Sequence, residues 1–143
     1  MRIIRTVEPG KRLIGKLAHG VDLLEALTNI CVEKGISLGR LEALGAVKKA
    51  RIGFYNQAAR EYEFLELDKP LEILKVIGNV STRDDKTMVH AHITLGDNEG
   101  RAFGGHLAPG TIVFACEYVI EELAGNPLER GFDEETGLPL WQD

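Results

Sequence analysis

The chain has 143 residues, 44% of them hydrophobic and 27% charged, which is the size and composition of one ordinary globular domain. Its 17 basic and 22 acidic side chains give a net charge of −5, which does not favour a broad basic surface for nucleic acid. Cys31 and Cys116 lie in apolar runs and form no disulfide framework, so buried, reduced thiols are predicted. The N-terminus lacks a signal-peptide pattern, and the apolar stretch at 111–120 is too short to cross a bilayer. We therefore expect a cytoplasmic protein.

The first part of the chain combines strand patterns with one helix. Residues 21–34 carry apolar side chains at helical spacing, and Gly35 is placed to end that helix in a left-handed conformation. Alternation with a period of two then returns and indicates strands. The strands predicted in this part are 1–7, 12–17, 37–47 and 49–55.

The second part reads as strands joined by short turns. A polar turn at 56–60 and Pro70 separate the first of them, and a turn-rich loop at 96–100 predicts a hairpin. The predicted strands are 61–67, 71–80, 88–95, 101–107 and 111–123. This order predicts the α+β class, with a mainly antiparallel sheet and one principal helix packed on it. One domain is expected over 1–125, with an irregular tail over 126–143 packed on the same domain.

Three of the four histidines fall on the predicted hairpin. His90 and His92 are two residues apart in a strand, so both imidazoles project from the same face. A hairpin centred on Asn98 places His106 opposite His90, and Gly104 opposite His92. All three imidazoles then share one face, and a register slip of a single residue would separate them.

Three neutral imidazoles suit a divalent metal, with zinc preferred, and they leave a coordination position open. The alternative is three polar residues on a solvated or subunit-facing surface. Glu72 and Glu117 interrupt apolar strands and are candidates for a catalytic base or for orienting an imidazole. They are also explained as ordinary outward-facing strand residues.

Several segments, in this order, resemble the PPC domain, the "plants and prokaryotes conserved" domain, over about residues 5–125. The tail around 132–141 is similar to that of archaeal and bacterial single-domain members. The segments that carry the resemblance are LEALGAV at 41–47, PLEIL at 70–74, GNVS at 78–81, HAHI at 90–93, GGHL at 104–107 and FACE at 114–117.

The resemblance implies a strongly bent sheet, a homotrimer and a DNA-binding or regulatory role. The plant members carry an AT-hook, which this sequence lacks, so DNA stays an open partner that net charge does not support. The fold is also similar to that of acetolactate decarboxylase, whose zinc is held by a His-x-His pair and a later histidine. His90, His92 and His106 match that arrangement. Two alternatives follow: a metal-dependent lyase or hydrolase acting on a small organic acid, or a small-molecule-binding or structural trimer.

Overall fold

Nine strands and one helix are formed within residues 2–142, the part of the chain that the computed structural model describes. Their bounds are β1 Glu8–Lys16, α1 Leu23–Lys34, β2 Gly39–Asn56, β3 Glu61–Leu67, β4 Leu71–Arg83, β5 Lys86–Gly96, β6 Ala102–Leu107, β7 Ile112–Ala124, β8 Arg130–Phe132 and β9 Pro139–Trp141. None of the helical segments in 2–142 has the length and apolar character needed to cross a bilayer.

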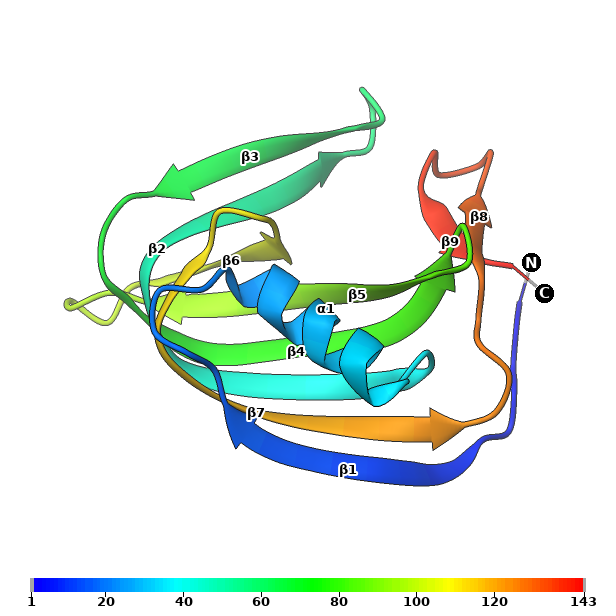
Figure 1. The fold of residues 1–143 in the computed structure, drawn as a ribbon. Coiled ribbons are helices and arrows are strands. Elements are labelled where there is room, and N and C mark those ends of the chain that lie inside the picture. The colour runs from blue at the N-terminus through cyan, green and yellow to red at the C-terminus, as the bar shows by residue number, and fades with distance from the viewer. Residues whose placement is uncertain (1, 143) are drawn as a thin grey trace.

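One antiparallel sheet contains seven of the strands, in the order β1-β7-β2-β4-β5-β6, with β3 paired to β2. The long strand β2 pairs with β4 along its first half and with β6 in its second half. Because β4 also pairs with β5, and β5 with β6, these four strands form a closed circuit. Figure 1 shows the curved strands behind α1, with the β8–β9 hairpin beside the chain termini. The hairpin contacts β4, since Nε of Arg130 on β8 donates to Oγ of Ser81 on β4 at 2.7 Å.

A bulge at Gly45 allows β2 to change direction. Gly45 has φ 145°, and a Cβ there would lie 2.1 Å from the carbonyl oxygen of Ala115. The pairing of β2 with β4 shifts register between Ala43 and Gly45. Only glycine combines this conformation with such close backbone approach. The bend lies between the start of β2, which pairs with β4, and the later part of β2, which pairs with β3 and β6.

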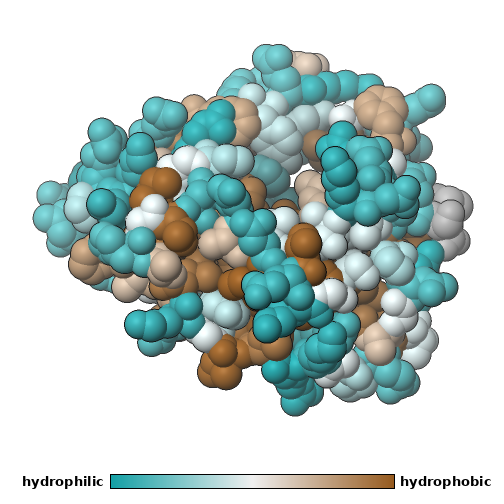
Figure 2. Space-filling view, in the orientation of Figure 1, coloured by the Kyte–Doolittle hydropathy of each residue, from teal (hydrophilic) through white to brown (hydrophobic). Residues whose placement is uncertain are grey.

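The helix begins and ends where its capping residues predict. Asp22 is the N-cap, its carboxylate accepting from the amide of Glu25 at 3.1 Å, and Gly35 ends the helix at φ 66°. One face of α1 is fully buried against the inward side chains of the sheet. Figure 2 shows hydrophobic and hydrophilic residues intermixed on the outer surface of this side of the molecule. Both cysteines are buried and free, as predicted.

The predicted α+β class is wrong, because the protein is mainly β. The single helix has 12 residues, whereas β2 alone has 18, since the segments predicted at 37–47 and 49–55 are one continuous strand. The helix therefore covers only part of a core that the sheet builds largely by curving on itself. The strand predicted at 1–7 is also absent over residues 2–7. Glu8 already pairs with Ala124, the last residue of β7, so earlier residues have no partner strand there.

Candidate metal centre

The two histidines of β5 project from the face of the strand opposite the helix. Their neighbours Val89, Ala91 and Ile93 are buried in the core, which leaves His90 and His92 on the outer face. This alternation is the one predicted from the sequence.

The predicted pairing within the hairpin is wrong by two residues, but the shared face is preserved. His92, rather than His90, lies opposite His106, and Gly104 lies opposite Thr94. The loop runs over residues 97–101 instead of 96–100, so the hairpin is centred one residue later. Because the pairing shifts by two residues, an even number, all three imidazoles remain on the same side.

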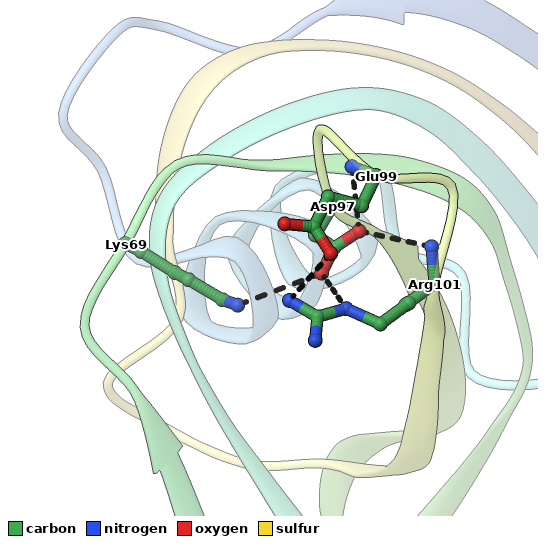
Figure 3. Close-up of polar contacts among 4 residues, drawn as sticks. All are labelled: Lys69, Asp97, Glu99 and Arg101. Atoms are coloured by element: carbon green, nitrogen blue, oxygen red, sulfur yellow. Dashed lines mark hydrogen bonds and ion pairs between the residues drawn. The ribbon is translucent and has the colours of Figure 1, made fainter.

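Asp97 fixes the position of this loop. Its carboxylate accepts from the amides of Glu99 and Arg101, each at 2.9 Å, and from Nε of Arg101 at 2.8 Å (Figure 3). Lys69 Nζ approaches the same carboxylate at 3.7 Å. Burial raises the pKa of Asp97, but these hydrogen bonds outweigh burial and bring the pKa to about 2. The sequence shows Asp97 as a turn residue, but not which residues its carboxylate would fix.

The three histidines converge tightly. Their ring centroids are 5.1 Å apart for His90 and His106, 5.2 Å for His90 and His92, and 5.8 Å for His92 and His106. One ring nitrogen from each lies within 4.8 Å of the others, and within residues 2–142 this is the one such group of possible metal ligands. Zinc–nitrogen bonds of about 2.0–2.1 Å require only a modest closing of the rings around an ion.

Burial favours the neutral, metal-binding form of His90 and His106. Burial, followed by the charges of His106, Arg130 and His92, lowers the pKa of His90 to about 4. Burial also lowers the pKa of His106. In addition, Nδ1 of His106 is buried without a hydrogen-bond partner in the described residues. An unsatisfied buried acceptor is costly, and coordination to a metal would satisfy it. The three residues therefore fit a divalent ion.

Two cavities open beside the histidines, and the other residues that line them were not predicted from the sequence. One, of about 390 Å³, contains His90 and His92 with Arg40, Glu42 and Asn79. Arg40 and Glu42 reach it because β2, β4 and β5 are adjacent, a pairing over long sequence separation that no local pattern shows.

The other cavity, of about 370 Å³, contains His90 and His106 with Tyr62 and Arg130. The centroid of the Tyr62 ring lies 4.7 Å from the centroid of the His106 ring. This close approach depends on Gly53, where a Cβ would lie 3.1 Å from Tyr62 and 3.5 Å from His106.

The two glutamates singled out from the sequence lie away from the histidines. Both are exposed on the outer face of the sheet. Glu72 pairs with Gly96, four residues beyond His92, or about 13 Å along the strand. Glu117 is on β7, separated from β5 by β2 and β4, a distance of about 14 Å across the sheet. The structure does not bring either carboxylate to the histidine cluster.

Comparison with known proteins assigns the family. The model of the Plants and Prokaryotes Conserved (PCC) domain, the PPC domain named above, matches residues 4–124. The chain belongs to this family. The PCC fold is shared with a metal-containing protein from Archaeoglobus fulgidus, at 43% identity and a TM-score of 0.94, each chain being covered completely. A PPC protein from Pyrococcus horikoshii is 33% identical with a TM-score of 0.93, covering 99% of this chain and 98% of that one.

More distant matches differ in description and in length. A protein from Bacteroides thetaiotaomicron described as a DNA-binding candidate is 26% identical with a TM-score of 0.85, covering 96% of this chain and 98% of that one. The bifunctional protein GlmU of Synechococcus sp. is 29% identical over 124 residues, or 85% of this chain. The chain spans about a fifth of the length of the curated relatives that it matches, since the aligned part is 19% of that GlmU protein.

Proposed function

We propose that this chain is a regulatory PCC-family protein that binds one divalent metal ion, with zinc preferred, through His90, His92 and His106. The observation that carries the proposal is the convergence of three imidazoles, together with the buried Nδ1 of His106, which has no hydrogen-bond partner in the described residues. Three protein ligands leave coordination positions open, as in sites that bind a further ligand. The description of the Archaeoglobus relative as metal-containing supports the same proposal.

Elemental analysis of protein purified without a histidine tag tests the metal site. We expect about one zinc per chain in the wild type and loss of the metal in His92→Ala. His19→Ala is the matched control, because His19 lies outside the cluster and contacts the carbonyl oxygen of Phe114 at 2.8 Å. Absence of metal after incubation with zinc, or equal metal content in His92→Ala, would exclude the site.

We further propose that the protein acts as a homotrimer, as the family resemblance implies. The outer face of the sheet offers an apolar surface for a second copy, formed by Ile14, Leu44, Leu74, Ile77 and Val119. Ile14 lies opposite Val119, and both line one cavity with Leu44 and Leu74, so these side chains are neighbours. Exposed apolar groups gathered in this way are typical of protein–protein contacts.

DNA binding is a second candidate function, supported by the description of the Bacteroides neighbour. The best basic cluster is Lys48, Lys49 and Arg51, on β2. Fluorescence anisotropy at low salt should then show binding that weakens as salt rises and is reduced in the double variant Lys48→Glu, Lys49→Glu. Lys86→Glu serves as the control for a change in net charge. No binding to mixed DNA at low salt would exclude this candidate.

A further inference from the structure

Arg130 is a buried cation whose hydrogen-bond acceptors are all neutral. Its residue is 8% exposed, and it donates from Nε to Ser81 Oγ at 2.7 Å and from Nη2 to Asn79 Oδ1 at 2.8 Å. Nη1 donates to the carbonyl oxygen of Pro139 at 3.1 Å, and the guanidinium carbon lies 5.5 Å from the Trp141 ring centroid. The β8–β9 hairpin and β4 thus hold the guanidinium in place.

No carboxylate within residues 2–142 compensates this charge, since none forms an ion pair with Arg130. Buried charges in proteins are normally paired, because an isolated one is costly. Of the five guanidinium N–H groups, three have the neutral acceptors described above. Two N–H groups therefore remain, one on each terminal nitrogen. A carboxylate that binds an arginine in bidentate fashion accepts two such hydrogen bonds.

The guanidinium lines the same cavity as two of the histidines. Asn79, which accepts from Arg130, lies directly opposite His90 across β4 and β5. Three arginines and one glutamate line this cavity, although the whole chain has a net charge of −5. The cavity is therefore locally positive in an acidic protein.

A metal ion would make the cavity more positive still. Three neutral imidazoles bring no negative charge to balance a dication, so the ion and Arg130 would present two positive centres to one small space. The phenol of Tyr62 also lines this space and has no hydrogen-bond partner in 2–142. It adds a neutral donor beside the histidines.

We propose that this cavity binds a small organic carboxylate, held in bidentate fashion by Arg130 while a second oxygen of the ligand faces the histidine-bound metal. The inference deepens the proposed metal site by naming its ligand class. Binding of the carboxylate by Arg130 is inferred from the buried guanidinium and does not require the metal. The cavity volume of about 370 Å³ suits a small ligand rather than a peptide or a nucleotide chain.

Lactate and lactamide provide a matched pair of probes, because they share size and hydroxyl group and differ in the carboxylate charge. Both are titrated into the full chain at neutral pH, with and without zinc, and amide chemical shifts of β4, β6 and β8 are followed by NMR. We expect lactate to bind at least about tenfold more tightly than lactamide. Equal binding of the two, or no binding of lactate, would overturn the proposal. Tighter, Arg130-dependent binding of inorganic phosphate would overturn the carboxylate class.

Arg130→Lys keeps the charge but loses the planar fork, and it should weaken lactate binding about tenfold or more. Arg83→Lys is the control, because Arg83 lines the same cavity but is paired with Asp84 at the surface. If Arg130→Lys does not fold, Tyr62→Phe keeps the ring against His106 and should still weaken lactate binding severalfold. Unchanged affinity in both variants would contradict the proposal.

The metal-free arm distinguishes this proposal from the metal site. Arg130-dependent lactate binding by protein that takes up no zinc would support the carboxylate cavity and exclude the metal site. Zinc uptake without preference for lactate over lactamide would support the metal site and exclude the carboxylate cavity.

Discussion

Burial holds His90 in the protonation state that a metal ion requires, and this has a measurable cost at low pH. The unfolded chain protonates a histidine near pH 6.5, whereas the pKa of His90 in the folded chain is about 4. In the metal-free protein, the contribution of His90 to the free energy of unfolding is therefore fully present above about pH 6.5. It is lost as pH falls toward 4, with an upper bound of about 3 kcal/mol.

Urea unfolding of the metal-free protein at several pH values between about 7 and 4 measures this loss. His90→Gln should flatten the decline in the free energy of unfolding, because glutamine does not titrate. His19→Gln should leave the decline as it is in the wild type. A decline of equal steepness in His90→Gln would show that other groups cause it.

Asp22 connects the start of the helix to the loop before β7. One carboxylate oxygen accepts from the amide of Glu25 at 3.1 Å, and the other accepts from the amide of Gly110 at 2.7 Å. Asp22→Ala removes both acceptors and should lower the free energy of unfolding by about 2 kcal/mol. Asp22→Asn, which keeps one acceptor, should lose less. A loss below about 0.5 kcal/mol in Asp22→Ala, measured by urea unfolding, would contradict this role.

At the scale of elements, the β5–β6 hairpin sets the relative position of His92 and His106. The Asp97 side chain is 1% exposed and holds the loop through the contacts shown in Figure 3. Asp97→Ala should therefore speed hydrogen exchange of the amides over 97–101 and lower the zinc content, since the register is less firmly fixed. Asp97→Asn should be intermediate.

Hydrogen exchange followed by NMR, together with elemental analysis, checks this prediction. Glu99→Ala is the control, because it leaves the backbone amide that donates to Asp97 in place. Wild-type exchange rates and metal content in Asp97→Ala would show that the loop does not determine the site.

Local patterns in the sequence predicted those features that depend on nearby residues. The helix ending at Gly35, the hairpin and the shared face of the three histidines all follow from spacing or from turn chemistry. The predicted pairing partner of His106 was wrong, because a turn-rich loop permits two hairpin centres that differ by one residue. The contacts of Asp97 determine which of the two centres is formed. The α+β class was wrong because sheet curvature, and the core it builds, depend on pairings far apart in sequence.

The remaining part of the site could not be predicted for the same physical reason. Arg130 reaches Ser81 and Asn79 across about fifty residues of sequence, and nothing near Arg130 indicates those partners. Tyr62 meets His106 only because β3 and β6 both flank the second half of β2. A buried arginine in the C-terminal segment has no local signal.

At the scale of the whole molecule, the proposed trimer predicts a mass of three times 15.8 kDa, about 47 kDa, by light scattering. Leu74→Glu places a charge in the apolar outer face and should shift the mass toward 15.8 kDa. Val32→Glu is the matched control, since Val32 on the helix is 58% exposed and Leu74 is 55% exposed. A wild-type mass of 15.8 kDa would refute the trimer.

The proposed function depends on one metal ion coordinated by the three histidines of β5 and β6. Anomalous diffraction at the zinc absorption edge, on crystals of the zinc-loaded full chain, tests this most directly. We expect one peak per chain at about 2.0–2.1 Å from a ring nitrogen of each of His90, His92 and His106. A peak at other residues, or no peak at these histidines in zinc-saturated crystals, would contradict it.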